Sequence, residues 1–185
     1  MGKKFWASSI IVLALALTGC SATEEISQSP TPDPTPTIDQ QLVPSEEPKN
    51  VETVDSNLFL TSYGDIVFKV GEGPTWCTIS EFDDFVICEH REFDATYLPL
   101  PVPADCEFTY GYQIRLLGSS QAGKAAEFTC ANAAWSDASM APILEDGQRI
   151  EAFGFSCFVE GTAARCENQS GDYIVLGPDV WALSE

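Results

Sequence analysis

Residues 155–166 read Phe155-Ser156-Cys157-Phe158-Val159-Glu160-Gly161-Thr162-Ala163-Ala164-Arg165-Cys166, two short strand-like runs on either side of Gly161-Thr162. A glycine at the first position of a two-residue loop is what a type II′ hairpin turn requires. Counting outward from Glu160 and Ala163 places Cys157 opposite Cys166 in a non-hydrogen-bonded pair, a spacing that suits a disulfide. The stretch therefore predicts an antiparallel hairpin closed by a Cys157–Cys166 bond.

The same count predicts a second hairpin. Cys77 falls opposite Cys88 when residues 81–84 form a four-residue loop. The six cysteines of this part of the chain allow fifteen connectivities, and the two hairpin pairs leave Cys106 to bond with Cys130. Each hairpin ends in Cys-Glu and a polar residue, which raises the hypothesis of an internal duplication: the endings are Cys88-Glu89-His90 and Cys166-Glu167-Asn168.

Short runs of β-branched and aromatic residues continue through residues 58–185, separated by Gly and Pro. They have the length and composition of strands, and no stretch keeps a helical period over three turns. Only residues 131–140 would suit one helical turn. We therefore predict an all-β domain over residues 58–185, a small disulfide-stapled antiparallel sandwich or barrel. Its strands are expected near residues 58–60, 66–70, 75–79, 85–88, 108–117, 152–159 and 173–176.

The N-terminal segment predicts export and lipid anchoring. Lys3 and Lys4 precede an apolar run over residues 5–17, and Leu17-Thr18-Gly19-Cys20 has the form of a bacterial lipobox. The run is shorter than the roughly 20 residues that cross a bilayer, which argues against a membrane-spanning anchor. A plain secretory signal is also the weaker interpretation, because its cleavage would not need a cysteine directly after Leu17-Thr18-Gly19. We expect residues 1–19 to be a signal peptide. Cys20 would then carry palmitate-type acyl chains on the extracytoplasmic face of the cell membrane.

Composition predicts a tether and restricts the partners. Residues 20–57 are rich in Pro, Ser, Thr and acids, as in a disordered linker. Without residues 1–19 the chain keeps 7 of its 9 basic residues and all 28 acidic ones, a formal charge of −21. That charge repels phosphate backbones, so we exclude nucleic acids as partners. It indicates either simple solubility or attraction to a cationic partner.

Few residues indicate chemistry. His90 is the only histidine, and the charged residues around it predict a solvated loop or strand end. Asp83 and Asp84 fall in the predicted hairpin loop, where aspartate is common, although paired carboxylates also suit glycoside hydrolysis or Ca²⁺ binding. Residues 118–123 are rich in glycine but lack the Gly-Lys-Ser/Thr ending of a phosphate-binding loop. We expect no catalytic residue, no metal site and no cofactor.

Aromatic residues are the better binding candidates. A small β domain buries most of its aromatic side chains, but Trp135 stands among small and polar neighbours, Ala133-Ala134 and Ser136-Asp137. We therefore expect Trp135 to contact a ligand. A glycan-binding platform would also draw on other aromatic residues: Trp76, Trp181, Tyr97, Tyr110 and Tyr112.

Several segments follow one another in a distinctive order: residues 68–77, Val86-Ile87-Cys88-Glu89, residues 99–103, residues 123–130, residues 142–147, Phe155-Ser156-Cys157 and Arg165-Cys166-Glu167-Asn168. This order resembles a family of uncharacterised exported proteins and lipoproteins of actinobacteria, over about residues 66–183. Where that family often has Gly-His-Gly-Phe, this chain has Gly171-Asp172-Tyr173-Ile174 and keeps only the first glycine. The resemblance implies no known catalytic residue.

These observations favour a membrane-anchored surface domain without catalytic activity, which binds a cell-wall component or an extracellular protein. One alternative is an inhibitor or protective factor against a cationic secreted enzyme such as a muramidase, a role that the acidity suits. Another is a carboxylate-based wall hydrolase that uses Asp83 or Asp84.

Overall fold

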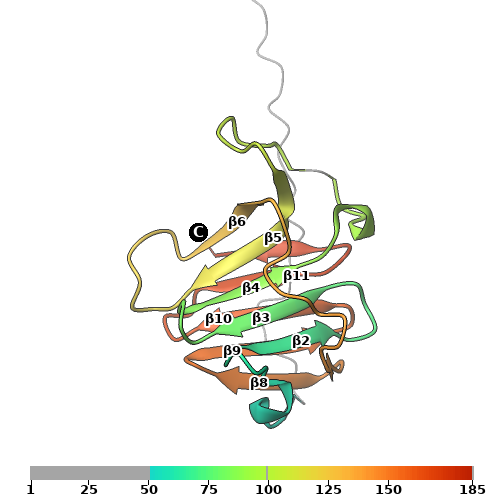
Figure 1. Cartoon of the computed structure of the whole chain (residues 1–185), viewed down its shortest axis with the longest axis vertical. Helices are drawn as coiled ribbons and strands as arrows, with labels where there is room; N and C mark the ends of the chain where they lie inside the picture. The colour runs from blue at the N-terminus through green and yellow to red at the C-terminus, as the bar shows by residue number, and fades with distance from the viewer. Residues whose placement is uncertain (1–50, 99, 185) are drawn as a thin grey trace, which may run out of the picture. The chain divides into compact units, whose positions relative to one another are not determined.

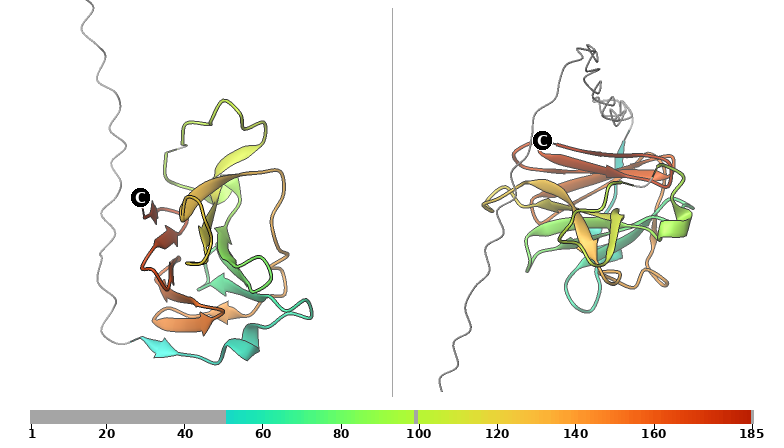
Figure 2. Two further views of the ribbon diagram at one scale, coloured as in Figure 1. Left: turned by 90° about the vertical axis from the view of Figure 1, so that its left-hand side faces the viewer. Right: turned by 90° about the horizontal axis from the view of Figure 1, so that it is seen from above.

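Two six-stranded β-sheets pack face to face in the computed structural model, which describes residues 51–98 and 100–184 (Figures 1 and 2). The prediction of an all-β domain is confirmed, and the arrangement is a sandwich. Among these residues no helix is long and apolar enough to cross a membrane. The predicted signal peptide, the lipid on Cys20 and the linker up to residue 50 lie outside the described residues.

The first sheet has the strand order β6-β5-β4-β3-β2-β7, and the second has β1-β8-β9-β10-β11-β12. The strands of the first sheet are β2 (Ile66–Val70), β3 (Trp76–Ser80), β4 (Phe85–Glu89), β5 (Thr109–Leu117), β6 (Ala126–Ala131) and β7 (Ile143–Leu144). Those of the second are β1 (Glu52–Thr53), β8 (Gln148–Ala152), β9 (Phe155–Glu160), β10 (Ala163–Asn168), β11 (Tyr173–Leu176) and β12 (Trp181–Leu183). Two short 3-10 helices, η1 (Ser56–Phe59) and η2 (Glu92–Asp94), lie in the connections.

The two sheets repeat one topology. Each contains a five-stranded antiparallel meander, β2–β6 or β8–β12, in which a disulfide joins the second strand to the third. The short strand that precedes each meander completes the other sheet, because β1 pairs in parallel with β8 and β7 pairs in parallel with β2. We refer to residues 52–131 as the first half of the domain and to residues 143–183 as the second half.

Residues at equivalent positions of the two halves face each other in the core. Strand register places one row across the first sheet and a corresponding row across the second. Both rows have cysteine at their second and third positions and isoleucine at the fourth, which supports the internal duplication suggested by the Cys-Glu endings. The rows are Phe68, Cys77, Cys88, Ile114 and Phe128, and Ile150, Cys157, Cys166, Ile174 and Leu183.

All three disulfides have the pairing predicted from the spacing. The Cys77–Cys88 and Cys157–Cys166 bonds are fully buried in the centre of the sandwich, and the Sγ atoms of Cys88 and Cys166 lie 3.9 Å apart across the two sheets. Their Cα atoms are 4.1 and 4.0 Å apart, as expected for non-hydrogen-bonded antiparallel pairs. Since all these sulfurs are bonded in disulfides, their proximity does not form a metal site.

Three sequence predictions were wrong in detail. Residues 58–60 are not a strand, because the Asp55 side chain accepts a hydrogen bond from the Asn57 N–H and caps helix η1. Residues 152–159 are not one strand, because Phe153-Gly154 forms a hairpin turn with φ of 52° and 86° at its two positions, as a type I′ turn needs. Residues 131–140 contain no helical turn.

The boundary between linker and domain also needs correction. Residues 51–57 were predicted to belong to the linker, but β1 pairs with β8 and the Val54 N–H donates to the carbonyl oxygen of Arg149 at 2.9 Å. Val54 also packs against the hydrophobic core. The folded domain therefore includes these residues. The sequence did not indicate this, because the segment is short and polar.

Candidate functional site

The outer face of the first sheet carries a row of polar side chains. Side chains alternate between the two faces of a strand, so the residues next to the core row point outward. Strand register places Lys69 opposite Trp76, Trp76 opposite Glu89, and Glu89 opposite Gln113. The row thus crosses four strands from β2 to β5, and an outward-facing carboxylate stands in the middle of it.

This row is covered by the crossover loop, residues 132–142, which runs from β6 at one edge of the sheet to β7 at the other (Figure 1). The loop has no regular secondary structure, so its backbone groups need partners from elsewhere. The hydroxyl groups of Thr78 and Ser136 are hydrogen-bonded at 2.7 Å, which ties the loop to β3. Thr78 is fully buried as a result of this covering.

Glu89 is the main attachment point of the crossover loop. Its carboxylate accepts hydrogen bonds from the backbone N–H of Trp135 at 3.0 Å and from that of Ser136 at 3.3 Å. It also accepts from Trp76 Nε1 at 2.9 Å and from Gln113 Nε2 at 2.7 Å. Glu89 is only 3% exposed. A buried carboxylate with four donors has its desolvation offset by charge-assisted hydrogen bonds.

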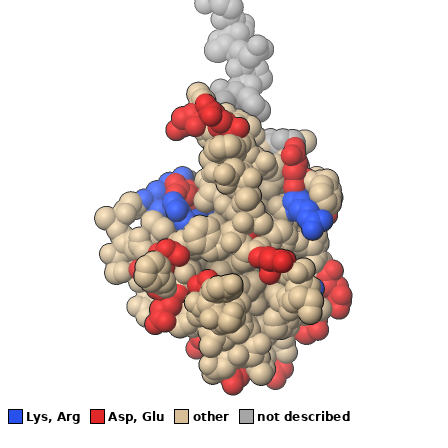
Figure 3. Space-filling model, in the orientation of Figure 1, with Lys and Arg blue, Asp and Glu red and all other residues tan. Residues whose placement is uncertain are grey.

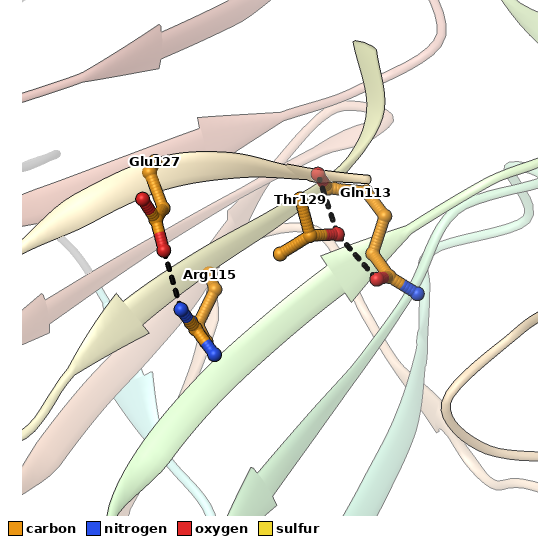
Figure 4. A network of polar contacts seen from close by, with 4 residues as sticks. All are labelled: Gln113, Arg115, Glu127 and Thr129. Atoms are coloured by element: carbon orange, nitrogen blue, oxygen red, sulfur yellow. Dashed lines mark hydrogen bonds and ion pairs between the residues drawn. The ribbon is translucent and has the colours of Figure 1, made fainter. Parts of the chain in front are cut away.

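Further polar contacts extend this network along β5 and β6 (Figure 4). The Thr129 hydroxyl donates to the side-chain oxygen of Gln113, which orients the Gln113 amide nitrogen toward Glu89. One step along the same strands, Arg115 forms an ion pair with Glu127. The carboxylate in the row is therefore held by a chain of hydrogen bonds that spans three neighbouring strands.

A cleft of about 770 Å³ lies on this face between the crossover loop and the hairpin of β2 and β3. We call it the Trp135 cleft. Trp135 is 49% exposed, and its ring packs on Phe85 in an edge-to-face contact with centroids 4.9 Å apart. The residues that line the cleft include Lys69, Thr75, Trp76, Arg91, Asp94, Trp135 and Asp137.

The structure brings together only some of the aromatic residues singled out in the sequence. Trp76 and Trp135 both line the Trp135 cleft. Tyr97 and Tyr112 stack on each other beside His90, and Tyr110 and Trp181 pack on Phe128. The six candidates thus form three separate groups, and the first of them lines the Trp135 cleft.

Asp83 and Asp84 serve the turns between strands. The Asp83 carboxylate accepts a hydrogen bond from the Ser80 hydroxyl at 3.2 Å, and the Asp84 carboxylate accepts one from Ser120 at 2.9 Å. A Cβ atom at Gly118 would lie 2.0 Å from Asp84 Oδ1, so a larger residue there would displace the Asp84 side chain. The glycine-rich segment over residues 118–123 is therefore a largely exposed loop that hydrogen-bonds to the Asp83–Asp84 turn.

His90 is buried, with 5% of its surface exposed. The prediction from its charged neighbours, that it lies in a solvated loop or strand end, was wrong. Its Nδ1–H donates to the carbonyl oxygen of Arg91 at 3.0 Å, and its Nε2 lies 2.9 Å from the Tyr97 hydroxyl. The same hydroxyl lies 2.7 Å from the Gly111 carbonyl oxygen, so its single proton is shared between these two acceptors. The charged residues around His90 in the sequence did not reveal that the long β4–β5 connection folds back over it.

Burial lowers the pKa of His90 below its usual value of 6.5, against smaller opposing effects of the Arg91 carbonyl and the Asp94 carboxylate. The unfolded chain therefore binds a proton more readily than the folded one. This contribution to stability is present above about pH 6.5 and is lost as the pH falls through the lower folded pKa. Burial also raises the pKa values of Tyr97 and Tyr112, so both remain neutral over this range.

We predict that the melting temperature of the wild-type domain decreases as the pH is lowered from 7 to 5. In a His90→Gln variant this decrease should be smaller. The measurement is thermal unfolding followed by circular dichroism at each pH, and the difference between the two proteins isolates the histidine from the carboxylates. Equal slopes for both proteins would show that His90 is not neutral and buried in solution.

The chain matches no protein-family model, no curated protein and no solved structure. The resemblance to exported actinobacterial proteins stays a prediction. Comparison within the molecule is more informative. The positions equivalent to Lys69, Trp76 and Glu89 in the second half are Glu151, Ser156 and Glu167.

These second-half residues form the same row in β-sheet register, but no described loop crosses them, and Glu167 has a side chain that is 41% exposed. They border a smaller concavity of about 480 Å³. The sheet therefore forms without a tryptophan, a lysine or a covering loop at these positions. The Trp135 cleft is formed by the crossover loop, which is the segment that connects the two halves.

Proposed function

We propose that this protein is a non-catalytic binding domain, held at the outer face of the cell membrane by lipid on Cys20, and that it binds a cell-wall glycan in the Trp135 cleft. One observation carries the proposal: a half-exposed tryptophan stands in the Trp135 cleft, whereas the equivalent concavity of the other half is smaller and has no tryptophan. Sugar rings bind well to such aromatic faces, because their C–H groups pack on the ring while their hydroxyls bond to polar neighbours.

The geometry supports binding because Trp135 is held before a ligand arrives. Glu89 accepts a hydrogen bond from the Trp135 backbone N–H at 3.0 Å, and the indole ring packs edge-to-face with Phe85. A side chain that is already ordered loses little entropy on binding. Ser136 and Asp137 supply a hydroxyl and a carboxylate group around the same space.

The proposed anchor explains how such a domain is retained at the wall. The formal charge of −21 would keep it from binding anionic lipid head groups by itself. An acylated Cys20 followed by a Pro-rich linker would hold the domain near the membrane and let it reach wall polymer.

We expect Trp135→Ala to weaken binding of purified, soluble peptidoglycan fragments by at least about tenfold, because the variant removes the apolar surface on which a sugar would pack. Quenching of intrinsic tryptophan fluorescence by the fragments, confirmed by calorimetry, is the measurement. Phe82→Ala is the matched control, since Phe82 is a more exposed aromatic residue outside the cleft and its removal should change nothing.

A second candidate function is inhibition of a cationic secreted enzyme. It is favoured by the β4–β5 connection, residues 90–108, where acidic residues accompany exposed apolar side chains: Phe93, Leu98, Val102 and Phe108. In Figure 3 acidic side chains form several patches, one of them at the top of the domain, whereas basic ones gather at two places. Fragment binding that survives Trp135→Ala, together with binding to a lysozyme that fails in high salt, would favour this candidate. No observation favours a hydrolase.

A further inference from the structure

The few basic side chains of this acidic domain are distributed unevenly. Residues 51–98 and 100–184 contain six lysines and arginines. Three of them pair with carboxylates on neighbouring positions: Arg115 with Glu127, Arg149 with Glu151, and Arg165 with Glu167. The other three, Lys69, Arg91 and Lys124, form no ion pair within the described residues, and two of these line the Trp135 cleft.

Lys69 and Arg91 both line the Trp135 cleft together with Trp76. Lys69 lies directly opposite Trp76 in the β2–β3 pair, where Cβ atoms are about 5 Å apart. Arg91 follows Glu89, the other neighbour of Trp76, by two residues. The Arg91 guanidinium lies 5.6 Å from the centre of the Phe93 ring, a contact that leaves its N–H donors available for a ligand.

Two carboxylates also line the cleft, so its formal charge is zero in a protein whose net charge is −19. The Asp137 carboxylate accepts the Ser139 N–H at 2.9 Å, which lowers its pKa and occupies one of its oxygens. The concavity at the equivalent place in the second half has only acidic ionisable side chains, Glu151 and Glu167. The Trp135 cleft is therefore the more favourable of these two places for an anion.

We infer that the ligand of the Trp135 cleft is a glycan that carries carboxylate groups, with its sugar face on Trp135 and a carboxylate bound by Lys69 and Arg91. This inference rests on the proposed function and adds the chemical class of the ligand. Arginine binds carboxylates with paired N–H donors and lysine with a point charge, so together they select an acid over a neutral sugar. The carboxylate could belong to an acidic sugar or to a peptide attached to the glycan.

The test is a sedimentation assay with insoluble peptidoglycan, either native or with its carboxyl groups amidated by carbodiimide and ethanolamine. We expect wild-type protein to bind the amidated polymer at least about tenfold more weakly. Lys69→Gln and Arg91→Gln should each weaken binding to native polymer and reduce the difference between the two polymers. Lys124→Gln is the control, because Lys124 is also unpaired but lies outside the cleft.

Each outcome is decisive. Equal binding of wild-type protein to native and amidated polymer overturns the carboxylate inference and leaves glycan binding intact. Absence of binding to either polymer overturns the proposed function as well. Polygalacturonate, an acidic polysaccharide without peptide, separates the two sources: competition by it assigns the carboxylate to a sugar, and no competition assigns it to the peptide. Unchanged circular dichroism spectra of the variants confirm that they are folded.

Discussion

Replacing Glu89 with alanine is expected to lower the free energy of unfolding by about 3–4 kcal/mol, because the change leaves several buried donors without an acceptor. Two of these are the backbone N–H groups of Trp135 and Ser136, and the others are the side-chain nitrogens of Trp76 and Gln113. Loss of a hydrogen bond to a charged group costs about 1.5–3 kcal/mol, and the four losses are not additive because the loop can move toward water.

Urea denaturation at neutral pH measures this change, with the second half of the domain as the control. Glu167→Ala alters the equivalent position, where the side chain is 41% exposed and bonds to Arg165. We expect that variant to lose less than about 1 kcal/mol. Similar losses for the two variants would show that Glu89 does not hold the crossover loop. Glu89→Ala should also alter the fluorescence of Trp135, since its backbone loses an anchor.

The second large effect concerns the disulfides. The sequence and the structure predict different rankings of their contributions to the free energy of unfolding. Chain entropy alone predicts that Cys106–Cys130 contributes most, because its sequence separation is 24 against 11 and 9 for the others. In the structure, however, the Cys77–Cys88 and Cys157–Cys166 bonds are fully buried, and they touch at the centre of the core. Their replacement by alanine adds a cavity to the lost cross-link.

We therefore expect the double alanine variants C77A/C88A and C157A/C166A to lose about 4–5 kcal/mol each, and C106A/C130A to lose about 3 kcal/mol. Chemical denaturation of the three variants under non-reducing conditions gives the order directly. A larger loss in C106A/C130A than in the other two would mean that loop closure outweighs packing in this core.

Much of the fold could be predicted because its hairpins are local. Gly161 has φ of 62°, as the type II′ turn requires, and the pairing of Cys157 with Cys166 follows from that turn. The pairing of Cys77 with Cys88 follows in the same way from the loop over residues 81–84. The pairing of β1 and β7 with the sheet of the other half could not be predicted. A two-residue strand has no detectable sequence pattern, and its partner is remote in sequence.

The candidate site was predicted in part. The small and polar neighbours of Trp135 indicated exposure, and the structure shows a half-exposed ring. Glu89 was missed because its sequence context resembles that of Glu167, each following a disulfide cysteine at the end of a hairpin. One is 3% exposed and accepts four donors, whereas the other has a side chain that is 41% exposed.

By itself the sequence determined the all-β class, the three disulfide pairs and the register of the two hairpins, because turns and near neighbours along the chain control these features. Only the tertiary structure decided that the two hairpins lie back to back with their disulfides in contact and that a loop covers one outer face. Trp135 reaches Glu89 across 46 positions of sequence. A contact of that span depends on the path of the whole chain, and similar local motifs therefore acquire different environments.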